Sequence, residues 1–354
     1  CIKIYKSIFC EQNCQFLHIV KSKNMPTSKE NYDAYLREHV CKGPSGNGCL
    51  YETSYTATRS DGRKVKVGGV YAWRDVNALA DVFITHFLVD YMKKLRNAYA
   101  DYPDIYHQQL YNQIDFMVSK AIDRNGALVW ENHEGYAQGM EQAEYAYLFS
   151  SIASVYKQNN EIKLARNTLT LALRLARAFN IQVGKHTGGV CSITTYGGSK
   201  RARFRPCFWF HSKGVGITDG VKGERTVLNQ HLHVIRDLLS MYLVVQVAPD
   251  LVDSQFGTAT QVLAYLEDKA IGGLYQLVFT EGHKPDVPYR PPNIRQFMNY
   301  KTGRVAPTPE HPDGNPLSYY FAHYEYNMRP DQENPVEKPA TLCWYHTHVL
   351  EITA

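Results

Sequence analysis

Residues 145–179 read YAYLFSSIASVYKQNNEIKLARNTLTLALRLARAF, and their apolar spacing predicts two successive helices. Apolar side chains recur every three or four positions from Tyr145 to Tyr156, and again from Ile162 to Phe179. That spacing places them on one face of an α-helix. The two helices are therefore expected to pair as a hairpin.

Four more apolar stripes with the same spacing lie outside this stretch, in residues 76–95, 106–121, 228–242 and 262–274. The six stripes make three helix pairs, separated by short extended pieces near Gly126 and Gly188. We expect a mainly α fold, an incomplete α/α toroid of helix hairpins with β-ribbon insertions. In such a fold inner helices line a central cleft and loops at one end carry the chemistry. A helical-repeat solenoid ranks second, because no period shorter than 50 residues repeats.

The remaining segments differ in character from the helical stripes. Residues 1–75 are expected to form a β-rich or irregular N-terminal segment, with a β-hairpin that turns at Ser60-Asp61-Gly62. Residues 76–354 are expected to form the toroid-like domain, which becomes Pro-rich and aromatic from Pro285 to Pro339. Because the chain starts at Cys1 rather than Met, we expect it to be a piece of a longer protein.

Composition restricts the class of function. With 44% hydrophobic and 21% charged residues the chain is typical of a globular protein, and it has no apolar run of about 18 residues for a membrane span. The net charge of +5 is too diffuse to favour nucleic acid, but it is compatible with an acidic ligand. The 26 tyrosines suit sugar binding, since phenols both stack and hydrogen-bond.

Several kinds of site are disfavoured by the absence of their motifs. The eight cysteines include no Cys-x-x-Cys pair, so neither a structural zinc nor any other metal is expected, and disulfide connectivity stays open. No Gly-x-Ser-x-Gly elbow or Walker phosphate loop is present, which argues against serine hydrolases and nucleotide-dependent enzymes. We expect no cofactor.

Three segments carry candidate functional residues. Glu134–Gly139 contains Tyr136 and Gln138 just ahead of a helix, where glycines permit close approach of a ligand. Asn229 and His233 share one face of a later helix. The stretch Trp344-Tyr345-His346-Thr347-His348 combines two aromatic rings with two imidazoles and indicates a lined pocket. The aromatic run from Phe208 to His211 is interpreted as core.

These segments, in this order, resemble the C-terminal helical domain of the D-glucuronyl carbon-5 epimerases, over about residues 125 to 352. The Ala-Gln-Gly that heads an inner helix of that family is matched by Ala137-Gln138-Gly139. Its Val-Leu-Asn is matched by Val227-Leu228-Asn229, and its terminal Tyr-His-x-x-His looks like Tyr345-His346-Thr347-His348, which is one residue shorter. The chain has Gln230 where the family has Gly after the Asn.

The resemblance implies an isomerase that removes the proton at carbon 5 of glucuronate and returns one to the opposite face. Tyr345 is expected to be one proton-transfer group, with Tyr300 or Tyr319 as the other. Arg295, Arg304 or Arg329 would stabilise the developing enolate at the carboxylate. Expected substrate-binding residues are Tyr136, Gln138, Asn229, His233, Arg295, Arg304, Arg329, His346 and His348.

Three other functions stay open at this point. A polysaccharide lyase performs the same proton abstraction and then expels the 4-linked sugar. A glycoside hydrolase needs two carboxylates, but Glu131, Glu134, Glu141 and Glu144 lie in one segment, which favours an exposed helix surface. A glycan-binding protein would keep only the aromatic site. The resemblance also implies an acidic polysaccharide as partner, a homodimer as one assembly, and a secreted, cell-surface or secretory-lumen location.

Overall fold

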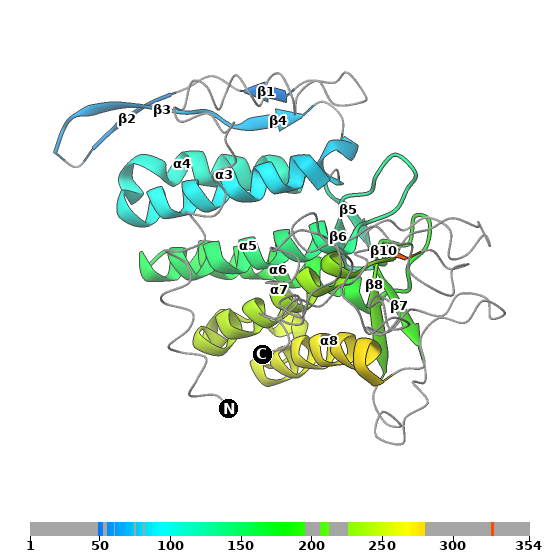
Figure 1. Ribbon diagram of the computed structural model, residues 1–354. Helices are drawn as coiled ribbons and strands as arrows, with labels where there is room; N and C mark the ends of the chain where they lie inside the picture. The colour runs from blue at the N-terminus through cyan, green and yellow to red at the C-terminus, as the bar shows by residue number, and fades with distance from the viewer. Residues whose placement is uncertain are drawn as a thin grey trace, which may run out of the picture. The chain divides into compact units, whose positions relative to one another are not determined.

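The structure is a computed structural model, and it describes residues 49–51, 55–59, 61–73, 76–80, 82–194, 206–211, 226–279 and 327–328 (Figure 1). Contacts divide the chain into two units. The first contains Cys1–Glu52 and Tyr71–Asp75, and the second contains Thr53–Val70 and Val76–Ala354. In the first unit β1 (Cys49–Tyr51) pairs antiparallel with β4 (Tyr71–Trp73), and Leu50 lies opposite Ala72.

The second unit begins with the predicted hairpin, in which β2 (Tyr55–Thr58) pairs antiparallel with β3 (Lys64–Val67). Gly62 has a backbone φ of +82°, which residues other than glycine rarely adopt. Next to it, Arg63 donates its backbone N–H to Asp61 Oδ1 at 3.0 Å. The Asp-Gly turn therefore forms as the sequence predicts.

Six α-helices in the described residues make this unit mainly α, as expected. They are α3 (Val82–Asp101), α4 (Pro103–Ser119), α5 (Gly139–Gln158), α6 (Ile162–Ala176), α7 (Leu228–Val247) and α8 (Ala259–Phe279). Short 3-10 helices accompany them, namely η2 (Val76–Ala80), η3 (Arg177–Asn180), η4 (Pro249–Leu251) and η5 (Ser254–Phe256).

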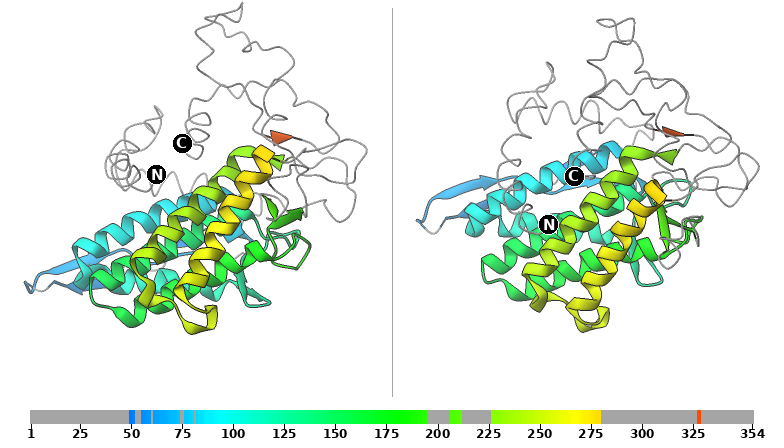
Figure 2. Two further views of the ribbon diagram at one scale, coloured as in Figure 1. Left: turned by 90° about the horizontal axis from the view of Figure 1, so that it is seen from below. Right: turned by 60° about the horizontal axis from the view of Figure 1, so that its bottom comes forward.

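The helices pack as three consecutive pairs, α3 with α4, α5 with α6 and α7 with α8 (Figures 1 and 2). Across the pairs, the first helices contact one another in the order α3, α5, α7. The second helices pack mainly on their own partners. Helix α5 thus touches α3, α6 and α7, and most of its residues are buried, including Glu141 and Glu144.

Short two-stranded ribbons separate the helix pairs, as the glycine-containing joints predict. Strand β5 (Ile122–Arg124) pairs with β6 (Ala127–Val129) between α4 and α5, and β7 (Cys191–Thr194) pairs with β8 (Cys207–Phe210) between α6 and α7. Outside these joints, β9 (Thr226–Val227), just ahead of α7, pairs with β10 (Asn327–Met328), which follows α8 in the sequence. The rings of β8 are buried, which confirms that this aromatic run belongs to the core.

Glycines in α8 allow β8 to lie against that helix. A Cβ on Gly272 would stand 2.4 Å from Phe208 Cδ2, and one on Gly273 would stand 2.8 Å from the ring of Phe210. Both distances are too short for a real contact, so a side chain at either position would push the ribbon away from α8. None of the described helices is long and apolar enough to span a membrane.

Candidate functional site

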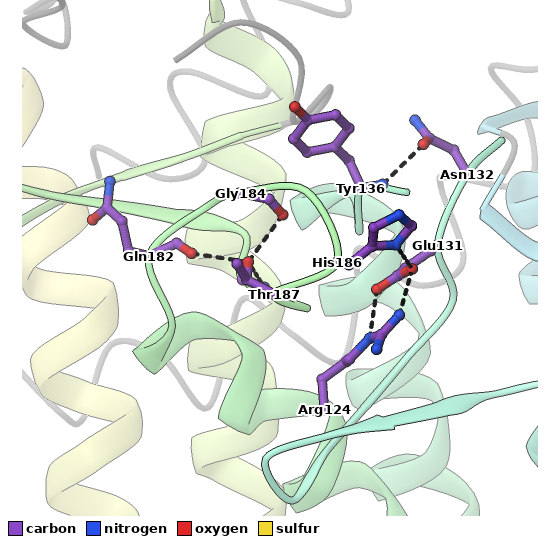
Figure 3. Close-up of polar contacts among 9 residues, drawn as sticks. Arg124, Glu131, Asn132, Tyr136, Gln182, Gly184, His186 and Thr187 are labelled. Atoms are coloured by element: carbon purple, nitrogen blue, oxygen red, sulfur yellow. Dashed lines mark hydrogen bonds and ion pairs between the residues drawn. The ribbon is translucent and has the colours of Figure 1, made fainter. Parts of the chain in front are cut away.

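Arg124, Glu131 and His186 form a cluster (Figure 3). Glu131 lies in the loop between β6 and α5, and His186 lies in the loop between η3 and β7. Arg124 ends β5 and holds the Glu131 carboxylate with two hydrogen bonds, from Nε to Oε1 at 2.8 Å and from Nη2 to Oε2 at 2.9 Å. His186 Nδ1 lies 2.9 Å from Glu131 Oε2. The Glu131 side chain is 5% exposed, whereas that of His186 is 57% exposed.

Charge keeps this carboxylate ionised. Desolvation works to raise the pKa of Glu131, but the hydrogen bonds from Arg124 and His186 outweigh it and hold the pKa below its usual range. The same pairing raises the pKa of the Arg124 guanidinium. An ionised carboxylate can only accept hydrogen bonds, so His186 must donate from Nδ1. That tautomer leaves Nε2 as the second functional atom of the ring.

The backbone around His186 is shaped to hold its ring at this place. His186 has a φ of +58°, and its backbone N–H donates to the Gly135 carbonyl at 2.7 Å. A Cβ on Gly135 would stand 2.3 Å from His186 Cε1, so the ring lies directly on that glycine. Gly188, with a φ of +71°, likewise leaves room for the stem of Arg124. In the sequence, only Gly135 and Gly188 indicated that side chains approach the backbone closely at this place.

Tyr136 and Gln138, both predicted from the sequence, belong to the same loop. Tyr136 is buried, donates its backbone N–H to Asn132 Oδ1 at 3.0 Å, and points its ring away from the Glu131 carboxylate in Figure 3. Gln138 precedes the first residue of α5 and donates its amide to the Ala80 carbonyl at 2.6 Å. Gly139 donates its N–H to the His211 carbonyl, where an added Cβ would stand 2.6 Å from that oxygen. The Ala-Gln-Gly motif therefore joins the start of α5 to Ala80 and His211.

A second polar cluster lies across the three helices that contact one another in series. It contains His86 and Lys93 of α3, Glu144 of α5, and Arg236 with Asp237 of α7. His86 Nδ1 is 3.4 Å from Glu144 Oε2, and Arg236 Nη2 is 2.9 Å from Asp237 Oδ1. His86 and Arg236 are partly exposed, with side chains at 49% and 32%, while both carboxylates are buried.

The groups of this cluster shift one another's ionisation. The Glu144 carboxylate raises the pKa of His86 against the opposing effect of burial and of Lys93. Burial works to raise the pKa of Glu144, but His86 and the nearby cations outweigh burial and hold that pKa below its usual value. For Asp237 burial prevails, and its pKa is raised despite the Arg236 guanidinium. The cluster thus offers a partly exposed imidazole and two cations on a buried acidic support.

The other predicted site residues are only partly within the described chain. His233 lies partly buried on α7, and Asn229 belongs to the same helix. The remaining predicted residues lie outside the described residues, namely Arg295, Tyr300, Arg304, Tyr319, Arg329, Tyr345, His346 and His348.

The expectation of an exposed carboxylate surface is wrong for three of the four glutamates. Glu131, Glu141 and Glu144 are buried, and only Glu134 is exposed. For Glu141 and Glu144 the physical reason is that α5 is enclosed by α3, α6 and α7 over most of its length. Glu131 precedes α5, and its carboxylate is held by Arg124 and His186. Periodicity within one helix does not indicate how many neighbours surround it.

Comparisons with known proteins gave no match among family models, curated proteins or solved structures. Within the described residues, no group of three or more His, Cys, Asp or Glu side chains is arranged to hold a metal ion.

Proposed function

We propose that the protein acts on a polysaccharide that contains uronic acid and epimerises glucuronate at carbon 5. The helix pairs would form part of an α/α toroid with α3, α5 and α7 on the inside. The contacts support this, since these three helices touch in series while α4, α6 and α8 pack mainly on their own partners. Neighbouring pairs would then be closer on the inner side of a curve.

The starts of the three inner helices gather at one end of the unit. Gln138, just before α5, bonds the carbonyl of Ala80, just before α3. His231, in the first turn of α7, accepts the backbone N–H of Phe210, while Gly139 bonds the neighbouring His211. Helix N-termini carry partial positive charge, so their grouping favours an anionic ligand. A uronate carboxylate has that character.

The observation that carries the proposal is the ion pair between the partly exposed His86 and the buried Glu144, beside Lys93 and Arg236. Proton removal next to a carboxylate creates an enolate with extra negative charge, which cations and hydrogen-bond donors stabilise. An imidazole oriented by a buried carboxylate is also a common acid–base group. The cluster combines both requirements on the helices assigned to the inner side.

Tyr345 remains the proposed proton-transfer tyrosine, with Tyr300 or Tyr319 as its partner. Arg295, Arg304 or Arg329 would add positive charge at the substrate carboxylate. A glycoside hydrolase is less favoured, because Glu131 and Glu144 are each paired with basic side chains and thus act as supports. Paired carboxylates with lowered pKa values are poor general acids.

The test is incubation of the protein with a glucuronate polymer in heavy water. Deuterium at carbon 5 without chain cleavage is the expected result and identifies an epimerase. New ultraviolet absorbance from an unsaturated sugar would instead identify a lyase and overturn the epimerase assignment. Binding without either signal would leave a glycan-binding protein and overturn the proposal of catalysis.

A further inference from the structure

We propose that His186 is a proton-transfer residue of this enzyme, and that Glu131 and Arg124 position it. The inference rests on the proposed function and deepens it, because it assigns the exchange of the carbon-5 proton to a residue outside the tyrosines. It is carried by the arrangement in Figure 3, in which the buried Glu131 carboxylate, paired with the partly exposed Arg124, holds an imidazole whose side chain is 57% exposed.

The first argument is the state of the ring. Glu131 is clamped by two hydrogen bonds from Arg124, so its Oε2 can only accept from His186 Nδ1. In the neutral ring, Nε2 then carries a lone pair and can accept a proton. A buried carboxylate behind a histidine is the usual way in which proteins fix the tautomer and the direction of such a base.

The second argument is the backbone conformation of His186 and the close packing of its ring on Gly135. The φ of +58° places His186 in the left-handed region, which His, like Asn and Asp, adopts more often than other residues with side chains. Here the backbone N–H of His186 donates to the Gly135 carbonyl, and the ring of His186 fills the space above that same glycine. The ring is therefore oriented by its contact with Gly135 and by the hydrogen bond from Nδ1 to Glu131 Oε2.

The loop does not need the imidazole for its own bracing. Thr187 Oγ1 donates within the loop, 2.9 Å from the Gly184 carbonyl and 3.1 Å from that of Gln182, and it accepts the N–H of Gly189 at 3.1 Å (Figure 3). These bonds close the turn independently of the His186 side chain. The His186 side chain, which is 57% exposed, is thus not needed to close this turn.

The step is a simple proton exchange. The Nε2 lone pair accepts the proton at carbon 5, and the C–H electron pair passes into the enolate of the uronate. The proposed proton-transfer tyrosine then donates its hydroxyl proton to the opposite face of carbon 5, and the imidazolium releases its proton to solvent. No oxidant, reductant or leaving group is involved. In heavy water the tyrosine hydroxyl carries a deuteron, so deuterium at carbon 5 reports the step.

The experiment compares His186→Asn with the wild-type protein in the carbon-5 exchange assay. Asn accepts the positive φ and so preserves the loop, while the base is lost. We expect exchange to fall by about 10²-fold or more, and millimolar imidazole added to the buffer to restore part of it. His133→Asn is the matched control, because His133 is 81% exposed and has no buried carboxylate behind it, and its exchange rate should equal that of wild type.

Glu131→Gln tests positioning separately. It should lower kcat with little change in KM, because binding does not depend on it, and added imidazole should not rescue it since His186 still fills the place of the base. Melting temperatures separate a folding defect from loss of the base. If His186→Asn fails to fold, a normal kcat in a folded Glu131→Gln protein would still overturn the assignment. Wild-type exchange with an unaffected His186→Asn variant rejects His186 alone, whereas wild-type protein without exchange rejects the proposed function itself.

Discussion

The imidazole of His231 lies flat on the indole of Trp209, with ring centroids 4.2 Å apart and planes 4° apart. His231 is fully buried at the point where β8 meets α7 and α8. Phe210 donates its backbone N–H to His231 Nδ1 at 3.1 Å, and Nε2 lies 3.1 Å from the Gly273 carbonyl. Both ring nitrogens are therefore satisfied only in the neutral ring with the proton on Nε2.

This arrangement predicts acid lability. Burial lowers the pKa of His231 to about 3, and burial together with His231 lowers the pKa of His211 to about 3. Because both folded values lie below the ordinary value of about 6.5, the unfolded chain binds more protons as pH falls. We expect the free energy of unfolding to decline from pH 6.5 down to about pH 3, by about 1.4 kcal/mol per pH unit for each histidine. Urea unfolding at a series of pH values measures this slope.

The contribution of His231 can be isolated by substitution. His231→Gln keeps a polar side chain that cannot titrate, so the slope below pH 6.5 should become smaller even if overall stability is lower. His133→Gln removes an exposed histidine and should leave the slope unchanged. An identical slope in His231→Gln and wild type would contradict the assignment of a buried neutral ring.

Gly272→Ala is expected to destabilise the protein by about 1–3 kcal/mol. On helix propensity alone, Ala in place of Gly should stabilise α8 by about 1 kcal/mol. The new Cβ, however, would stand 2.4 Å from Phe208 Cδ2 and 2.7 Å from the backbone oxygen of Pro206, so the ribbon must move. Ala264→Gly, at an exposed position of the same helix, measures the propensity effect by itself. A more stable Gly272→Ala protein would show that α8 and β8 are not in close contact.

The helices could be predicted from sequence because each buries a stripe of its own residues. The stripe from Ile162 to Phe179 became α6 and η3, and that from Tyr106 to Ala121 became most of α4. The prediction of one helix from the stripe in residues 76–95 was wrong at its start. Residues 76–80 form the 3-10 helix η2, and α3 begins only at Val82. Apolar spacing does not distinguish the two kinds of turn over five residues.

The polar clusters could not be predicted in the same way. His86 and Glu144 come together only because α3 packs on α5, and His186 reaches Glu131 only because two loops meet across 55 residues of sequence. Neither pair has a spacing that a single element imposes. Gly135 and the glycines at 184, 188 and 189 signalled close approach, but not which side chain approached.

Glu144→Gln is predicted to change how His86 titrates. The carboxylate raises the pKa of His86, so the folded protein holds the proton to higher pH than the unfolded chain. That contribution to stability is present below the unfolded pKa and is lost as pH rises through the folded one. The variant should lose this dependence, and the His86 ring should titrate at lower pH by NMR. Glu134→Gln, an exposed carboxylate outside the cluster, should leave the His86 titration as it is.

Tyr345→Phe tests the tyrosine that the terminal motif indicates. The substitution keeps the ring but removes the ionisable oxygen, so exchange at carbon 5 should fall by about 10²-fold or more while the melting temperature changes little. A structural tyrosine would behave in the opposite way, because loss of a hydrogen-bonded hydroxyl costs about 0.5–1.5 kcal/mol of stability and leaves turnover intact. Tyr102→Phe, at an exposed position between α3 and α4, is the matched control and should change neither quantity. Measured beside a melting curve, normal exchange in Tyr345→Phe would reject this tyrosine as a proton-transfer group, and the imidazole-rescue result for His186 would then decide whether a histidine carries the step alone.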